Sequence, residues 1–387
     1  MSDINSLNRP KFHLESGINL GKYVFLTGAT GTLGAYFLRE LLVRNYPVAV
    51  LVRPSRTKTA AQRVDAQLAL WESENDRLPR PVVIEGDLSG NGWLEEKKDW
   101  FRANVDSVIH SAASLEFYGK RNAEPYTTNI SGIQTILDLC RLADIRKFHH
   151  VSTAYVAGSK PYFCESECNV GQKFRNDYEQ SKIEAEMLVR NFGFDSLTVY
   201  RPSIVIGDTK NGYTPTLSGL YAVLKLVHTL VSRVSLGSTS ARLALATVGM
   251  CGKEYKNLVP VNWVAGVFAH IFSHEELHGK TYHLTSPNPP HIHEVAKAIQ
   301  DAVEKYSEMV PESDKTKCDQ DWFHTNFMGQ MRLFRAYTQE DPQFDSSNTI
   351  SAAPHLPCPT VDHELLMFLF HKVIESHFGK RWHLQNP

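Results

Sequence analysis

The most constraining feature of this chain is the segment at residues 23–34, which reads Tyr-Val-Phe-Leu-Thr-Gly-Ala-Thr-Gly-Thr-Leu-Gly. A short apolar run ends there in three closely spaced glycines, and an apolar pattern of helical period follows over Leu33–Arg44. The segment therefore predicts a strand, a tight turn and a helix whose start can bind phosphate groups. A glycine turn alone is a weak signal, because plain strand–helix turns in α/β proteins look similar.

Each glycine of this turn has a physical role in binding a dinucleotide. Gly28 permits the tight turn, Gly31 lets the backbone approach a pyrophosphate, and Gly34 lets the helix pack close to the strand. The backbone N–H groups at the helix start then face the phosphates. The cofactor contacts expected from this segment are Thr27, Gly28, Thr30, Gly31, Thr32, Leu33 and Gly34.

Strand-like and helix-like segments alternate along the first half of the chain. The helix-like stretches include Leu33–Arg44, Ile133–Ala143 and Tyr178–Asn191. This alternation predicts an α/β fold with a doubly wound parallel sheet, in which both faces of the largely apolar strands are covered. The strand-like runs are Tyr23–Thr27, Val48–Val52, Val82–Glu85, Ser107–His110, Lys147–Val151, Thr198–Arg201 and Thr281–Leu284.

The pattern changes after Gly207, where a loop rich in Asp, Thr, Gly and Pro begins. An amphipathic helix at Leu217–Val234 follows, and it could pack in a core, line an acyl tunnel as a lid, or touch a membrane. The predicted organisation is a lead-in at 1–21, an NADP-binding Rossmann domain at 22–207 to which strand 281–284 returns, and a smaller, mostly helical substrate-binding region at 208–280 and 285–387.

Composition excludes several classes of protein. A chain of 387 residues suggests two or three domains, and its formal net charge of −1 provides no global field for nucleic acid or an anionic membrane. The N-terminus lacks the apolar core of a secretory signal. The longest apolar stretch, residues 217–236, is interrupted by Lys225, His228 and Arg233 and is too polar to span a bilayer. Six scattered cysteines indicate reduced thiols, so we expect a cytoplasmic protein.

The end of the second strand favours NADPH over NADH. An acid at this position usually holds the ribose 2′-hydroxyl of NAD, whereas a base accommodates the 2′-phosphate of NADP. The chain has Arg53 there, with Arg56 or Arg63 as helpers, although a solvent-facing arginine is the plain alternative.

Two further loops are candidates for cofactor binding. Asp87 and Leu88 follow the third strand, where the acid could accept the adenine amino group and the leucine could back the ring. A turn or helix-capping role for Asp87 is an equal alternative. After the fourth strand come Ser111, Ala112 and Ala113, small residues where a cofactor needs close approach to the backbone.

A second motif, far downstream, adds catalytic chemistry. Tyr178 and Lys182 are one helical turn apart and share a face, so the lysine ammonium is expected to lower the tyrosine pKa. A tyrosine tuned in this way can protonate the alkoxide formed as hydride reaches a carbonyl. Thr153 lies at the end of the fifth strand, where its hydroxyl could hold the carbonyl oxygen. Lys182 could also hydrogen-bond the nicotinamide ribose.

With these motifs in this order, the chain resembles the extended branch of the short-chain dehydrogenase/reductase superfamily. Within that branch it is most similar to thioester reductase domains of nonribosomal peptide and polyketide assembly lines, to carboxylic acid reductase termini and to fatty acyl-CoA reductases. The matching segments are Val24–Leu42, Val50–Arg53, Gly86–Leu88, Val108–Phe117, Asn129–Gly132, His150–Gly158, Tyr178–Glu186, Tyr200–Asp208 and Val259–Val264.

The resemblance implies roles for individual residues. The catalytic hydroxyl of the family falls on Thr153, its acid on Tyr178 and its lysine on Lys182, and a helix-kinking asparagine near the active site falls on Asn129. From the segment Tyr200–Asp208, the residues expected near the cofactor are Arg201, Pro202 and Ile204.

The resemblance also implies a substrate, which is a CoA or carrier-bound thioester reduced with NADPH. Hydride attack gives a hemithioacetal that collapses to an aldehyde, and a second hydride could give an alcohol. Because no adenylation or carrier segment accompanies the motifs, we expect the thioester to arrive on a separate carrier protein, or else the substrate differs.

Other functions are weaker. His274-Glu-Glu-Leu-His278 matches a zinc pattern formally, but Gly279 ends the helix that would present both imidazoles, so no metal site is expected. The main alternative is a dehydrogenase, ketoreductase or epimerase of a free hydroxy or keto compound. Sugar-nucleotide enzymes of this branch usually carry Arg-x-x-Asn, which Arg201-Pro-Ser-Ile204 lacks. A non-catalytic dinucleotide sensor is disfavoured because the three catalytic side chains are all present.

Overall fold

The computed structural model describes residues 21–73, 75–90, 92–214, 219–231, 251–307 and 339–379. Within these residues a seven-stranded parallel sheet forms the centre of the molecule, with strand order β10-β7-β5-β4-β1-β2-β3. This confirms the predicted doubly wound α/β fold. The strands are β1 (Tyr23–Thr27), β2 (Val48–Val52), β3 (Val82–Glu85), β4 (Val105–His110), β5 (Lys147–Val151), β7 (Ser196–Pro202) and β10 (Thr281–Leu284).

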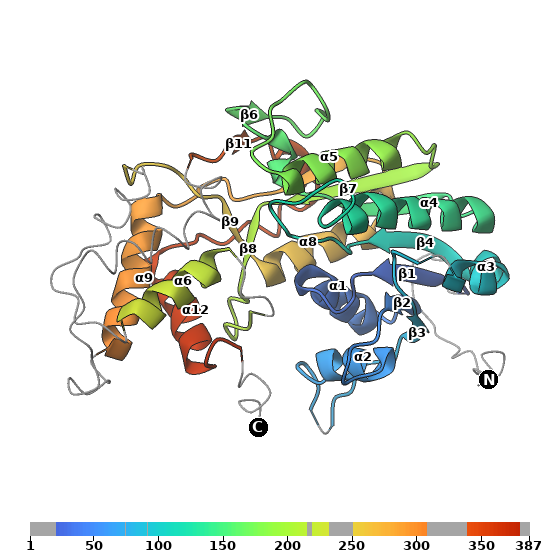
Figure 1. Ribbon diagram of the computed structural model, residues 1–387, viewed down its shortest axis with the longest axis horizontal. Helices are drawn as coiled ribbons and strands as arrows, with labels where there is room; N and C mark the ends of the chain where they lie inside the picture. The colour runs from blue at the N-terminus through green and yellow to red at the C-terminus, as the bar shows by residue number, and fades with distance from the viewer. Residues whose placement is uncertain are drawn as a thin grey trace.

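Helices cover both faces of this sheet (Figure 1). The order of the strands reverses between β1 and β4, so a crevice opens at their carboxyl ends, where open α/β sheets bind ligands. One face carries α1 (Thr32–Val43), α2 (Ala60–Leu68) and α8 (Val261–Ser273), and the other carries α3 (Gly92–Asn104), α4 (Gly132–Ala143) and α5 (Asp177–Arg190).

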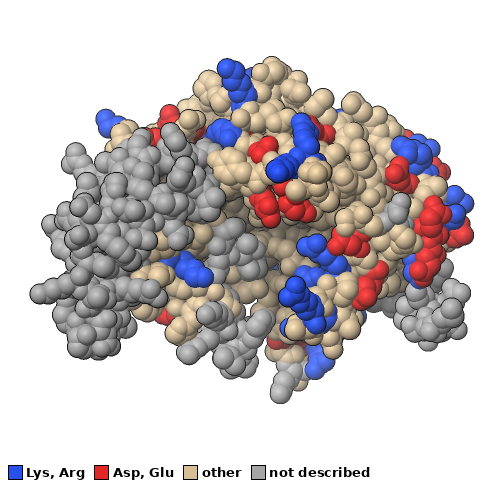
Figure 2. Space-filling view, viewed as in Figure 1, with Lys and Arg blue, Asp and Glu red and all other residues tan. Residues whose placement is uncertain are grey.

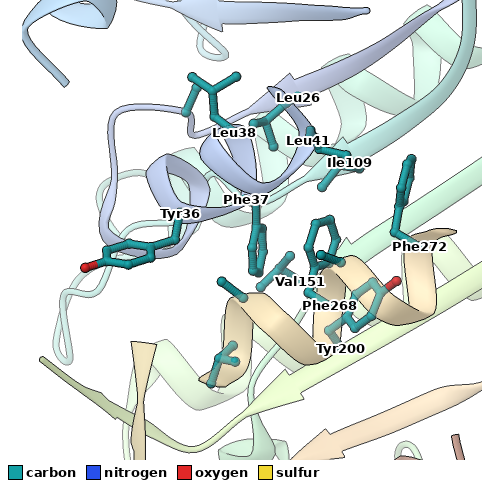
Figure 3. Close-up of a cluster of buried hydrophobic side chains, with 14 of the residues drawn as sticks. Leu26, Tyr36, Phe37, Leu38, Leu41, Ile109, Val151, Tyr200, Phe268 and Phe272 are labelled. Carbon is teal, nitrogen blue, oxygen red and sulfur yellow. The ribbon is translucent and has the colours of Figure 1, made fainter. Parts of the chain in front are cut away.

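The core beneath α1 is built around a stacked aromatic pair. Phe37 of α1 lies on Phe268 of α8 with ring centroids 3.9 Å apart, while Tyr36 points away from the cluster (Figure 3). The Tyr36 hydroxyl instead donates a hydrogen bond to Asp208 over 2.9 Å. A helix from downstream of β7 therefore completes the core on one face of the nucleotide-binding sheet.

A second group of helices lies to one side of the sheet (Figure 1). It contains α6 (Leu220–Val231), α9 (Ile292–Ser307) and α12 (His363–Glu375), which share one apolar cluster. The helix predicted at 217–234 corresponds to α6, and its first and last predicted residues lie outside the described part of the chain. Tyr221 and Leu224 of α6 are buried in this cluster, which is the core-packing alternative.

Short elements connect the helical group to the sheet. The described part of the chain contains two small parallel pairs, β8 (Ile204–Ile206) with β9 (Leu258–Pro260), and β6 (Tyr162–Phe163) with β11 (Gln343–Phe344). The short helix α11 (Ser347–Ala352) packs against β10. Strand β10 itself pairs in parallel with β7, as expected for a segment that returns to the first sheet. The predicted lead-in at 1–21 lies outside the described residues except for Gly21.

Charges on the described surface are mixed. On the face drawn in Figure 2, basic and acidic side chains are interspersed. Surface ion pairs such as Lys98 with Glu95 and Arg141 with Asp138 join opposite charges on α3 and α4. Among the described helices, none is both long and apolar enough to cross a membrane.

Candidate active site

The glycine turn after β1 packs tightly against the loop after β4. Gly28 has φ of +76°, and a Cβ atom there would lie 2.6 Å from the backbone nitrogen of Ala112. A Cβ on Gly34 would lie 2.1 Å from the carbonyl oxygen of Gly28, so only glycine lets α1 start this close to the turn. Gly31 is the N-cap of α1 and provides no side-chain cap. The helix start therefore remains suited to an oxygen of a bound phosphate.

Thr27 stabilises this turn from inside the protein. Its fully buried hydroxyl oxygen lies 2.9 Å from Nδ1 of His110 and accepts a hydrogen bond from the backbone of Ala112 over 3.3 Å. These contacts join β1 to β4 and place Ala112 and its neighbours Ser111 and Ala113 beside the turn. Thr27 thus supports the expected cofactor cradle, whereas we had expected a direct contact.

Two arginines gather at the end of β2. The guanidinium of Arg63, on α2, donates to the backbone oxygen of Arg53 over 2.5 Å and to the hydroxyl of Thr30 over 3.0 Å. The exposed side chain of Arg53 pairs with Asp87 at 3.4 Å. Both cations therefore lie beside the glycine turn. A capping box at Thr59 begins α2 and so sets the position of Arg63.

The loop after β3 is held by neighbouring side chains. Trp93 donates its indole N–H to the backbone oxygen of Asp87, and Thr135 donates its hydroxyl to that of Leu88, each over 3.0 Å. A Cβ on Gly132 would lie 3.2 Å from Cβ of Leu88, so α4 approaches this loop closely. The Asp87 carboxylate binds Ser89 and Arg53, which is a turn role alongside any contact with adenine.

The three expected catalytic side chains meet at the carboxyl end of β5. Asn176 caps α5 through a 2.9 Å bond from the backbone N–H of Glu179, and the helix carries Tyr178 and Lys182 one turn apart. Thr153 caps the 3₁₀ turn η3 (Ala154–Ala157), and its hydroxyl hydrogen-bonds that of Tyr178. The geometry thus brings a hydroxyl, a phenol and an amine together.

The electrostatics of this group differ from the expectation. Burial raises the pKa of Tyr178 to about 12, and the hydrogen bond with Thr153 opposes this only in part. Burial also lowers the pKa of Lys182 to about 8. The prediction that Lys182 lowers the tyrosine pKa is therefore wrong for this structure, because the lysine ammonium donates to the backbone oxygen of Val151 over 2.8 Å instead.

A loop from β4 covers the ring of Tyr178. Phe117 meets Tyr178 edge to face, with ring centroids 6.4 Å apart. Asp177 fixes this loop through three bonds, which it makes to the backbone oxygen of Phe117, the backbone N–H of Gly119 and the hydroxyl of Tyr126. Leu115 and Tyr118 of the same loop are about half exposed. The catalytic tyrosine therefore borders an apolar loop.

Asn129 lies in a helical distortion, as the resemblance implied. It belongs to the π-helical turn η2 (Thr127–Ser131), directly before α4. Its side chain accepts from the backbone N–H of Ser114 and donates to the hydroxyl of Ser181, each over 2.8 Å. The amide thus joins the loop after β4 to α5, whereas it was expected among the cofactor contacts.

Arg201 is also placed differently from the expectation. Its side chain is fully buried and pairs with Glu186 of α5 at 2.6 Å, and it donates to the backbone oxygen of Glu167 over 2.7 Å. These bonds assign it to a buried ion pair that supports the catalytic helix, and not to the cofactor. Pro202 accepts a 3.3 Å bond from the Thr153 hydroxyl, whereas Ile204 packs against the C-terminal helical cluster.

Some important residues were missed by the sequence reasoning. Glu186 could have been found, because it lies four residues after Lys182 and so on the same helical face. Asp177 could also have been found as an acid in the first turn of the catalytic helix. Asp341, which contacts Tyr155 over 2.7 Å, has no local signal because 186 positions separate the two.

The formal zinc pattern has no helix to present it. Helix α8 ends at Ser273, and the imidazoles of His274 and His278 contact the backbone oxygens of His270 and Phe272. Over the described ranges, no group of three or more His, Cys, Asp or Glu side chains is arranged to hold a metal ion.

Comparison with known proteins identifies a family for most of the chain. Residues 26–267 match an NAD-binding family described as Male sterility protein. The L-2-aminoadipate reductase of Schizosaccharomyces pombe is 31% identical over 236 residues, which are 54% of this chain and 16% of that protein. The fatty acyl-CoA reductase wat of Drosophila melanogaster is 26% identical over 271 residues, which are 59% of this chain and 52% of that protein.

A solved structure has the same fold. The terminal R domain of the myxalamid PKS-NRPS biosynthetic pathway superposes with a TM-score of 0.69 and 24% identity, covering 92% of this chain and 91% of that domain. The chain thus spans only a part of its sequence relatives, between 16% and 52% of the two named above, but nearly all of this R domain.

Proposed function

Because the chain belongs to the Male sterility protein family of NAD-binding domains, we propose that it reduces an acyl thioester to an aldehyde with NADPH. The chain is an oxidoreductase of the extended short-chain dehydrogenase/reductase type. The observation that carries the proposal is the meeting of Thr153, Tyr178 and Lys182 beside the crevice where the glycine turn lies.

The cofactor cradle fits a dinucleotide with a 2′-phosphate. The places that a Cβ would fill at Gly28 and Gly34, together with the uncapped start of α1, suit a pyrophosphate. Arg53 and Arg63 form a cationic pair at the end of β2, which supports NADPH over NADH. When bound, NADPH supplies the hydride.

The side chains of the triad then control the proton and the substrate oxygen. Thr153 holds the thioester carbonyl oxygen, and Tyr178, which its high pKa keeps protonated at neutral pH, gives that oxygen a proton as the carbon gains hydride. The product is a hemithioacetal. Its C–S bond breaks to release an aldehyde and a thiol, and a second hydride and proton would give an alcohol.

The apolar loop beside Tyr178 supports an acyl substrate. Leu115, Phe117 and Tyr118 present apolar surface next to the catalytic hydroxyl. The thiol carrier is either CoA or a separate acyl carrier protein, in keeping with the names of the relatives.

A second candidate uses the same residues. The triad also suits a dehydrogenase, ketoreductase or epimerase that acts on a free hydroxy or keto compound, because Tyr178 can protonate any alkoxide. Hydride transfer to a thioester and hydride transfer to a ketone differ only in whether a C–S bond breaks afterwards.

Oxidation of NADPH, followed by absorbance, tests the proposal. Acyl-CoA and acyl-carrier thioesters are compared with the matching aldehydes and ketones, using Tyr178→Phe as the blank and Tyr162→Phe, an exposed tyrosine, as the matched control. Turnover of thioesters with release of free thiol supports the reductase. Turnover of ketones alone moves the protein to the second candidate, and full activity of Tyr178→Phe would overturn the triad.

A further inference from the structure

A buried carboxylate from the C-terminal region reaches toward the triad. Asp341 is 7% exposed and accepts the hydroxyl proton of Tyr155 over 2.7 Å and the backbone N–H of Asn257 over 2.9 Å through one oxygen. Its other oxygen accepts from the ammonium of Lys256 over 3.1 Å and lies 3.8 Å from the guanidinium of Arg175. One side chain thus joins three separate segments of the upstream chain.

Two of these partners directly flank the catalytic residues. Tyr155 is the second residue after Thr153, within the η3 turn that Thr153 caps. Arg175 precedes Tyr178 by three residues and forms an ion pair with Glu179 at 2.8 Å. The guanidinium of Arg175 also lies over the ring of Tyr155, 5.0 Å from its centroid. The segments that carry the hydroxyl and the phenol therefore meet at Asp341.

The charges of this cluster balance. The cations Arg175 and Lys256 face the anions Glu179 and Asp341, and all four side chains are at most 7% exposed. Removal of one partner from such a cluster leaves a buried charge without a counterion, so the arrangement strongly favours a single geometry. The cluster is a network with one defined placement for η3 and for the start of α5.

We propose that Asp341 is a positioning residue through which the C-terminal region holds Thr153 and Tyr178 in the geometry for proton transfer. The proposal rests on the proposed function for the roles of those two residues. Asp341 acts through Tyr155 on the first and through Arg175 on the second. Substrate held by the C-terminal region would therefore meet a preformed pair of hydroxyls.

The kinetic test compares two buried carboxylates. Glu165 also ties the C-terminal segment to the sheet, by accepting from the backbones of His283 and Asn348, but it contacts neither η3 nor the start of α5. We expect Asp341→Asn to lower kcat about ten- to hundred-fold with little change in the Kd for NADPH, because small misplacements of reacting groups are costly. Glu165→Gln should keep kcat within about two-fold of wild type at a temperature where both variants are folded.

Tyr155→Phe is a milder variant for the case in which Asp341→Asn does not fold. It removes one hydroxyl and leaves the charge cluster intact, and we expect kcat to fall about three- to ten-fold, in keeping with the loss of one hydrogen bond. Equal losses of kcat in Asp341→Asn and Glu165→Gln, in step with their melting temperatures, would overturn the proposal.

An activity-independent measurement separates this proposal from the proposed function. Hydrogen exchange of the backbone amides at 153–158 and 175–181 is measured in the substrate-free protein. Faster exchange of both segments in Asp341→Asn, or in Tyr155→Phe, but not in Glu165→Gln supports the positioning role even if the wild type reduces no thioester. Unchanged exchange in the Asp341 and Tyr155 variants contradicts the proposal whatever the substrate is.

Discussion

The ammonium of Lys182 donates a hydrogen bond over 2.8 Å to the backbone oxygen of Val151, the last residue of β5. This bond fixes a positive charge against the strand that carries Thr153 two residues later. Two buried histidines line the same region, and burial lowers the pKa of His150 and lowers that of His110 to about 3. Lys182, with a pKa of about 8, is therefore the group in this set that changes charge closest to neutral pH.

Lys182→Met should stabilise the cofactor-free protein at pH 7. The folded pKa of about 8 lies below the ordinary value of 10.5, so the folded chain holds fewer protons than the unfolded chain between these values, and stability rises with pH across this window. At pH 7 the full cost of the buried charge applies, and we expect a gain of about 2 kcal/mol after loss of the bond to Val151.

Denaturant unfolding at pH 7 and pH 10 measures this effect. The gain should shrink at pH 10, where wild-type Lys182 is neutral in the folded state. Turnover should be lost at both pH values. A variant that is no more stable than wild type at pH 7 would contradict the assigned cost of the lysine.

Arg53→Ala and Arg63→Ala should weaken NADPH binding selectively. Each removes a cation beside the glycine turn, and we expect the Kd for NADPH to rise about ten-fold while that for NADH stays within about two-fold, since only NADPH carries the 2′-phosphate. Cofactor fluorescence titration provides both constants. Arg80→Ala, which removes an arginine paired with Glu72 and Asp65, is the matched control. An unchanged NADPH/NADH ratio in both variants would remove the 2′-phosphate assignment.

Glu186→Gln should destabilise the protein strongly. Burial raises the pKa of Glu186, but the contacts with Arg201 and Arg190 outweigh it and hold the pKa well below its usual range. Its stabilising effect is therefore present above the unfolded value of 4.5 and is lost as the pH falls below it. We expect a loss of about 3–5 kcal/mol at pH 7, because Arg201 is left buried without a counterion.

Urea unfolding at pH 7 and at pH 3 tests this prediction. Glu184→Gln is the control, because Glu184 lies on the same helix and pairs with the exposed Arg121, a contact worth less than about 1 kcal/mol. The difference between Glu186→Gln and wild type should narrow at the lower pH. Similar losses in the two variants would show that burial of the Arg201 pair is unimportant.

Phe117→Ala should change substrate selection and leave the cofactor untouched. The ring adjoins Tyr178, whereas the bond that fixes the loop uses the Phe117 backbone, so the loop should keep its path. Loss of apolar contact predicts a fall of about ten-fold in kcat/KM for long-chain thioesters and little change for an acetyl thioester. Chain-length series for variant and wild type provide the comparison, and parallel profiles would place the acyl chain elsewhere.

Much of the sheet was predictable from local pattern. Strands β1, β2, β3, β5 and β10 begin and end where their apolar runs do, because buried parallel strands need continuous side chains that pack on both faces. By contrast, β4 and β7 begin two residues earlier than predicted. Their first residues, Val105 and Ser196, lie next to helix and loop ends where residue type discriminates poorly.

The active-site triad was also predictable in place but not in charge state. The order of the motifs brought Thr153, Tyr178 and Lys182 together, yet the effect of the lysine on the tyrosine pKa depends on which oxygen the ammonium reaches, and the Val151 backbone has no side-chain signature. Arg201 was assigned to the cofactor because of its motif, whereas its burial with Glu186 depends on packing between β7 and α5.

The pairing of β10 with β7 has a consequence for how such a chain can be divided. Nearly eighty residues separate the two strands along the sequence, and the substrate-side segment between them leaves the sheet and comes back. A truncation after β7 would strip the outer edge of a buried parallel strand and remove α8, leaving the aromatic face of α1 in water. The nucleotide-binding half is thus no detachable module. New specificities in this architecture must arise by rewriting the excursion in place, with both of its anchor points kept.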